Sequence, residues 1–203
     1  QLLARFMPRP ADPPHLLRSA LEEYAAMHGK HRAGEKTPFH LYHVPRLLQW
    51  YPEARVLCIV RDGRDVVLSI LRAPWTPHQM IREHCRKWLR AVRYGEWLAQ
   101  RYPERVRQVR FEELLAQPEA ITRQVDAFVG LDFEAQQLVP SGRTDTIPDR
   151  ERPWKARAEQ DFDPSRIGDW ARRATPAQSR VMSSMMGPTL RRLGFADAAP
   201  VPC

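Results

Sequence analysis

A short apolar run, Val56-Leu57-Cys58-Ile59-Val60, constrains the fold of this chain more than any other segment. A run rich in β-branched residues, without polar alternation, predicts a strand that is buried on both faces of a parallel sheet. The chain then turns at Asp62-Gly63, and the residues that follow predict a helix with Val66, Val67 and Ile70 on its apolar side. Because a buried parallel strand needs partner strands and covering helices, the run favours an α/β fold.

Arg61 lies between the predicted strand and the predicted helix. Ligands of open α/β sheets bind at the carboxyl ends of the strands, and free backbone N–H groups at a helix N-terminus favour negative charge. Arg61 is therefore a candidate anion-binding residue. The alternative is a surface ion-pair cluster of Arg61, Asp62, Arg64 and Asp65, which would shape the turn and contribute little stability. On these grounds alone Ser69, roughly one and a half turns into the helix, has no assigned role.

The rest of the chain alternates helices and strands, which predicts an α/β layer fold. With 203 residues, 43% of them hydrophobic, the chain can bury one substantial core, and we expect a single domain over residues 1–203. On the longest predicted helix, His84 and the basic residues near it are expected on the solvated face. Predicted helices cover residues 15–28, 44–51, 78–101, 112–116, 118–130, 165–173 and 176–193, and a second strand covers 106–111.

The net charge of +8 predicts an anionic partner. Nucleic acid, a phosphorylated cofactor and an acidic or sulfated acceptor all fit, although the charge is spread along the chain and not gathered into a nucleic-acid-binding tail. The three cysteines form neither a disulfide framework nor a metal-ligand pattern, which favours a reducing compartment. No apolar stretch approaches the length that crosses a bilayer.

Residues 140–165 contain four prolines, many charges and almost no apolar periodicity. A loop of this length in a compact domain is usually functional or disordered. Trp154 and Lys155 lie in it among arginines, and an aromatic ring surrounded by cations suits an anionic nucleotide with a base to stack. The alternative is a surface loop without a ligand.

Several short segments follow one another in a fixed order between residue 35 and residue 195. They are Glu35-Lys36-Thr37-Pro38, Pro52-Glu53-Ala54, Arg61-Asp62-Gly63-Arg64-Asp65 with Ser69, Lys87-Trp88, Val109-Arg110-Phe111-Glu112-Glu113, and Gly168-Asp169-Trp170. In this order they resemble the sulfotransferases that use 3′-phosphoadenosine 5′-phosphosulfate (PAPS). The nearest likeness is to the tyrosylprotein branch and its bacterial relatives, in which a Lys-x-Pro-Phe segment leads to a Val-Arg-Asp-Gly-Arg segment.

The resemblance implies a three-layer, P-loop-NTPase-like α/β fold with a central parallel sheet flanked by helices. It places Arg61 and Ser69 on the 3′-phosphate of the cofactor and Lys36 at the transferring sulfuryl group. The 140–165 loop would cover the nucleotide, with Lys155 as its basic residue and Trp154 near the adenine. The implied protein is a metal-free cytoplasmic bacterial enzyme, with no nucleic-acid partner and no membrane span. It would sulfate a hydroxyl of a small molecule, glycan or peptide, and it could form a homodimer.

Three departures from the family pattern leave alternatives open. The Gly-rich phosphosulfate-binding loop and its strand are missing, so we expect that a chain starting at Gln1 has lost its N-terminal part. Phe111 stands where many relatives have a tyrosine, and no residue is assigned as the catalytic base, since His40 and His43 suit packing or loop roles better. The second hypothesis is a non-catalytic 3′-phosphonucleotide-binding remnant, and the third is a basic nucleic-acid-binding domain.

Overall fold

The computed structural model describes residues 12–73, 81–139 and 162–195. It divides into two compact units, Gln1–Ala54 and Arg55–Cys203, and each is described by itself. The expectation of one domain over residues 1–203 stays a prediction. No helix in the described ranges is long and apolar enough to cross a membrane.

The first unit contains helix α2 (Pro13–Met27), the 3-10 helix η1 (Pro38–His43) and helix α3 (Val44–Trp50). Helix α2 ends where Gly29 adopts a positive φ of 62°, a conformation that glycine reaches without steric cost. The segment after α3 binds back to α2, because the Tyr51 hydroxyl donates to the carbonyl of Pro14 and Arg18 pairs with Glu53 at 2.7 Å. These contacts hold the two helices of the unit together.

The second unit is built on two parallel strands, β1 (Val56–Val60) and β2 (Val106–Arg110). Their register pairs Val56 with Val106 and Val60 with Arg110, so the carboxyl ends of the strands meet at one edge. The connection between them contains helices α4 (Gly63–Leu71) and α5 (Ile81–Arg101), as parallel pairing requires. After β2 follow α6 (Phe111–Ala116), α7 (Pro118–Val129), η2 (Ala135–Leu138), η6 (Pro164–Arg166), α9 (Trp170–Arg173) and α10 (Pro176–Arg192).

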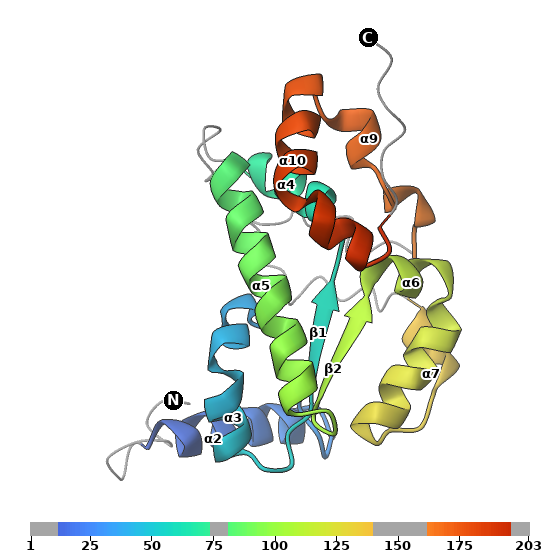
Figure 1. Ribbon diagram of the computed structural model, residues 1–203. Coiled ribbons are helices and arrows are strands. Elements are labelled where there is room, and N and C mark those ends of the chain that lie inside the picture. The colour runs from blue at the N-terminus through green and yellow to red at the C-terminus, as the bar shows by residue number, and fades with distance from the viewer. Residues whose placement is uncertain (1–11, 74–80, 140–161, 196–203) are drawn as a thin grey trace. The chain divides into compact units, whose positions relative to one another are not determined.

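The core of this unit lies where α4, α5 and α10 pack together above the sheet edge (Figure 1). Gly63, the first residue of α4, makes this packing close. A Cβ added there would lie 2.6 Å from the Trp88 ring and 2.8 Å from the sulfur of Met186. The buried core consists of Val60, Val67, Leu68, Leu71, Cys85, Trp88, Val92, Trp170, Met182, Met186, Leu190 and Phe195.

The structure confirms the predicted α/β class and the strand at 56–60, but the expectation that this strand is buried on both faces is wrong. Leu57 is 36% exposed and Ile59 is 56% exposed, whereas Val60 is buried. Helices α4, α5 and α10 cover only the face that carries Val60. On the other face, α7 contacts β2, where Arg107 donates to the carbonyl of Gln124.

The last predicted helices also differ in their bounds. The expected helix at 165–173 is a 3-10 turn, Pro164–Arg166, followed by the short helix α9, Trp170–Arg173. Gly168 separates them with a φ of 67°, a left-handed conformation that interrupts a helix. Helix α10 forms as predicted and starts with a capping box between Thr175 and Gln178.

Candidate functional site

Arg61 follows directly after β1, at the edge where the carboxyl ends of the two strands meet. Its Nη2 donates to the carbonyl of Arg166 at 3.1 Å and lies 3.5 Å from Asp65 Oδ2. Its guanidinium carbon stands 4.7 Å from the centre of the Phe111 ring, and Trp88 Nε1 donates to its carbonyl at 3.1 Å. The side chain is 20% exposed, and its Nε is a buried donor without a hydrogen-bond partner among the described residues. Arg61 is thus held in place while one donor remains unused.

Arg64 has a different environment, although it lies only three residues further along the chain. It forms a buried ion pair with Asp62, with Nη2 at 2.6 Å and Nε at 3.0 Å from the carboxylate oxygens. Asp62 also caps α4 by accepting the backbone N–H of Arg64 at 2.8 Å. The Arg64 guanidinium carbon lies 3.9 Å from the centre of the Trp170 ring. The alternative of a surface ion-pair cluster is therefore wrong for this pair, which belongs to the buried structure.

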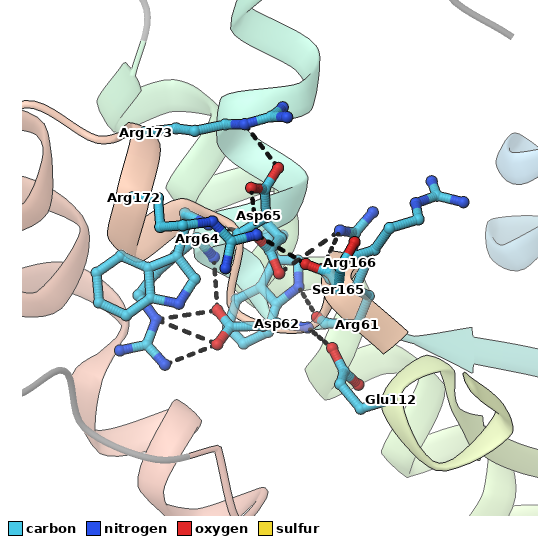
Figure 2. Close-up of polar contacts among 12 residues, drawn as sticks. Arg61, Asp62, Arg64, Asp65, Glu112, Ser165, Arg166, Arg172 and Arg173 are labelled. Carbon is cyan, nitrogen blue, oxygen red and sulfur yellow. Dashed lines mark hydrogen bonds and ion pairs between the residues drawn. The ribbon is translucent and has the colours of Figure 1, made fainter. Parts of the chain in front are cut away.

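Two further carboxylates are buried beside Arg61 (Figure 2). Asp65 accepts the backbone N–H of Trp170 at 2.7 Å, and Glu112 Oε1 accepts the backbone N–H of Asp62 at 2.9 Å. Burial raises the pKa of both carboxyls, while the Arg61 guanidinium acts in the opposite direction on the pKa of Asp65. Glu112 thus ties the turn after β2 to the turn after β1.

Arg166 is a second cation at this edge. Its guanidinium carbon lies 5.5 Å from the centre of the Phe111 ring, the same ring that Arg61 contacts. The guanidinium carbons of Arg61 and Arg166 therefore both lie within 5.5 Å of the centre of the Phe111 ring. Figure 2 shows Arg166 beside Arg61, brought there by the segment that leads into α9.

Sequence reasoning missed Glu112 and Arg166 as site residues. Glu112 carried a findable signal, because the carboxyl ends of paired parallel strands lie side by side and Glu112 follows β2 as Asp62 follows β1. Arg166 lies 105 residues from Arg61, and only its closeness to the Gly168-Asp169-Trp170 landmark pointed to this edge.

Ser69 is exposed on α4. It follows Asp65 by four residues, so it lies one turn further along the same side of the helix, about 6 Å along the axis. Arg61 contacts Asp65 at 3.5 Å, while Ser69 lies further along α4 and is exposed. The pairing of Arg61 with Ser69 stays a prediction.

The remaining predicted site residues belong to other segments of the chain. Lys36 is exposed and belongs to the unit Gln1–Ala54, just before η1, where the neighbouring Glu35 pairs with His40 at 2.7 Å. Trp154 and Lys155 lie outside the described residues, as does most of the 140–165 loop. The described ranges contain no group of three or more His, Cys, Asp or Glu side chains placed to hold a metal ion.

His84 differs from expectation. It is buried, with 9% of its surface exposed, and burial lowers its pKa below the ordinary value. His84 lies one turn before Trp88 on the same buried side of α5. The solvated face of the helix therefore does not include His84.

The sequence model described as "Sulfotransferase family" matches residues 6–135, more than half of the chain. The chain belongs to the sulfotransferase family. The fold of this sulfotransferase is also similar to solved sulfotransferase domains. The sulfotransferase domain from the curacin biosynthetic pathway shares 18% identity, with 90% of this chain and 68% of that chain covered and a TM-score of 0.64. The sulfotransferase domain of the Synechococcus PCC 7002 olefin synthase also shares 18% identity, with 89% and 65% covered and a TM-score of 0.67.

The chain of this sulfotransferase spans about two thirds of the length of those two domains. A search of curated proteins found no match. At this identity the structural likeness establishes the fold, a mixed α/β structure with a parallel sheet and flanking helices, and the family follows from the sequence model.

Proposed function

We propose that this sulfotransferase transfers a sulfuryl group from PAPS to a hydroxyl acceptor, and that Arg61 and Ser69 bind the 3′-phosphate of the nucleotide. The observation that carries the proposal is the position of Arg61 at the carboxyl edge of the sheet. There its guanidinium is held by neighbours, yet its buried Nε has no hydrogen-bond partner among the described residues.

The donor chemistry of this edge fits a phosphate group. A guanidinium forms charge-assisted hydrogen bonds with phosphate oxygens, each worth about 1.5–3 kcal/mol. Phe111 and the carbonyl of Arg166 restrict the Arg61 side chain in advance, so little further conformational entropy is lost when an anion binds. The Arg61 side chain is 20% exposed, so part of its guanidinium can be reached by a phosphate oxygen.

The charge balance at this edge also supports an anionic ligand. Asp65 offsets part of the charge on Arg61 through a contact of 3.5 Å. Arg166 adds a second positive charge near the Phe111 ring. Two carboxylates, Asp65 and Glu112, are buried beside Arg61, and burial raises the pKa of both. Burial disfavours the negatively charged form of Asp65 and so raises its pKa.

PAPS, when bound, supplies an activated sulfuryl group whose departure leaves negative charge on the adenosine phosphate. Lys36 is the residue that we assign to stabilise such charge, because an ammonium fixed near a developing anion favours the transition state over the ground state. Trp154 and Lys155 are assigned to the adenine and to the nucleotide phosphates, on the strength of the family resemblance.

The order of the motifs supports a place near the bacterial relatives of the tyrosylprotein branch. The acceptor is proposed as a hydroxyl of a small molecule, glycan or peptide. The catalytic base is not assigned.

The test is calorimetric binding of adenosine 3′,5′-bisphosphate, compared with adenosine 5′-monophosphate, which lacks the 3′-phosphate. The wild-type chain should prefer the bisphosphate. Arg61→Ala should lose about 10-fold to 100-fold in bisphosphate affinity, because one charge-assisted contact is removed, with little change for the monophosphate. The matched control is Arg123→Ala, which removes an exposed arginine of α7 that pairs with Glu119. An equal affinity of wild type and Arg61→Ala for the bisphosphate would refute the site.

A sulfuryl-transfer assay with PAPS then separates an enzyme from a binding module. Bisphosphate binding without turnover would support the non-catalytic 3′-phosphonucleotide-binding alternative. Binding that collapses with salt and ignores the 3′-phosphate would support the nucleic-acid-binding alternative.

A further inference from the structure

The exposed face of α5 carries a line of large side chains that do not pack in the core. Arg86, Arg90, Arg93 and Trp97 follow one another at spacings of four, three and four residues, so they lie on one side of the helix. We call this line the α5 stripe. The residues buried on α5, among them Trp88 and Leu98, lie on the opposite side. With the stripe, Leu89 and Tyr94 line an open groove of about 510 Å³.

The positive charge of the α5 stripe is not compensated within the helix. Both acidic residues of α5 are already used, since Glu83 pairs with Lys87 at 2.7 Å and Glu96 pairs with Arg192 of α10. Among the described residues no ion pair reaches Arg90 or Arg93. Like charges three or four residues apart destabilise a helix by about 0.2–0.5 kcal/mol per pair. The stripe therefore costs the fold some stability and leaves its charge available to a partner.

The aromatic end of the stripe is exposed but ordered. Trp97 is 46% exposed and stacks on Tyr94, with ring centres 5.3 Å apart and an interplanar angle of 18°. It also meets the edge of the Tyr102 ring at 6.5 Å. Trp, Tyr and Arg are the side chains that dominate the binding energy of protein interfaces. A stacked tryptophan has already lost its freedom, so a partner that contacts it loses little entropy.

We propose that the α5 stripe docks an acidic amphipathic helix of a partner protein. A helix lying along α5 that carries carboxylates at spacings of four and three residues places one opposite each of the three arginines. From Arg86 to Trp97 the stripe is about 16 Å long, three turns of helix. Apolar side chains of the same partner helix would cover Leu89 and Trp97, a mode of recognition that combines a groove with charge complementarity.

A helix fits this face better than a nucleic acid does. Leu89 and the Trp97 ring add an apolar floor to the groove, and aliphatic side chains of a protein helix match Leu89 as a phosphate backbone does not. Docking there also leaves the anion site open, because Trp88, which contacts Arg61, lies on the other side of α5. The inference is therefore independent of the proposed nucleotide chemistry.

The experiment uses the full chain and two fluorescein-labelled synthetic peptides of equal composition. One has glutamates at spacings of four and three with leucines beside them on one helical face, and the other has the same residues distributed around the helix. Fluorescence anisotropy near physiological salt should give at least tenfold tighter binding for the first peptide. Arg90→Glu, Arg93→Glu and Trp97→Ala should each weaken it severalfold, and the double arginine variant should abolish it. Arg123→Glu on α7 is the matched charge control and should leave binding unchanged.

Three outcomes would overturn the proposal. The first is equal binding of the two peptides, and the second is binding by the α5 variants that is no weaker than that of the Arg123→Glu control. The third is a labelled single-stranded oligonucleotide that binds through Arg90 and Arg93 more tightly than the acidic peptide does. Because Arg90 is exposed, its reversal leaves the fold intact, which circular dichroism would verify. Unchanged bisphosphate binding in the same variants would separate this surface from the anion site.

Discussion

Gly63 controls how closely α4 approaches α5, so we expect Gly63→Ala to be harmful although alanine is the better helix former. The added Cβ would lie 2.6 Å and 2.7 Å from two ring carbons of Trp88 and 2.8 Å from the sulfur of Met186. The Trp88 ring is buried and anchored by its hydrogen bond to the carbonyl of Arg61. The clash therefore meets a rigid group that cannot swing aside.

The size of the effect follows from two opposing contributions. Replacing a helical glycine by alanine gains at most about 1 kcal/mol of helix propensity, and less at the first position of a helix. Overpacking a dense core costs about 1–3 kcal/mol, and all three contacts are shorter than core atoms tolerate. The expected net result is a destabilisation of about 1–2 kcal/mol. Any displacement of Trp88 would also shift Arg61, so bisphosphate affinity should fall together with stability.

Urea unfolding followed by circular dichroism measures the change in stability, with Gly95→Ala as the matched control. Gly95 lies inside α5, where an added Cβ would meet only the amide nitrogen of the Gln108 side chain, at 3.1 Å. That flexible end can move, so Gly95→Ala should be neutral or stabilising by up to about 1 kcal/mol. If Gly63→Ala is as stable as wild type while Gly95→Ala behaves as expected, the close packing of α4 on Trp88 is not what positions Arg61.

Four further predictions concern buried charges near Arg61 and the proposed nucleotide-binding residues. Burial raises the pKa of Glu112, so the folded state binds the Glu112 proton more tightly than the unfolded state does. The free energy of unfolding should therefore fall as the pH rises through the folded-state pKa of Glu112. Glu112→Gln keeps the acceptor for the Asp62 N–H and should flatten that slope in pH-dependent urea titrations, whereas an unchanged slope would exclude Glu112 as its source. Arg64→Ala strands a buried carboxylate and should cost about 3–5 kcal/mol of unfolding free energy, with a loss under 1 kcal/mol contradicting the buried pair. Ser69→Ala should leave the melting temperature unchanged and weaken bisphosphate binding about 2-fold to 10-fold, while Lys36→Ala should lower turnover far more than affinity.

Several features could be predicted from the sequence because their causes are local. The β-branched run at 56–60 specifies a strand wherever it is placed, and the chain length between two such runs requires a helical crossover if they pair in parallel. Asp62 before Gly63 signals a capped helix start, and the structure contains that cap. From these features alone, Arg61 follows as a cation at the carboxyl edge of a parallel strand.

The sequence pointed to Arg61, but only the tertiary structure showed how the surroundings of Arg61 differ from those of Arg64. Both are arginines in one turn, yet Arg64 is buried against Asp62 and Trp170, while Arg61 keeps a donor unused. The difference comes from Phe111, Glu112, Arg166 and Trp170, which are brought to this edge by strand pairing and helix packing from up to 105 residues away. Local propensity carries no information about such contacts, because the burial that decides an ion's role depends on which distant surfaces exclude water around it.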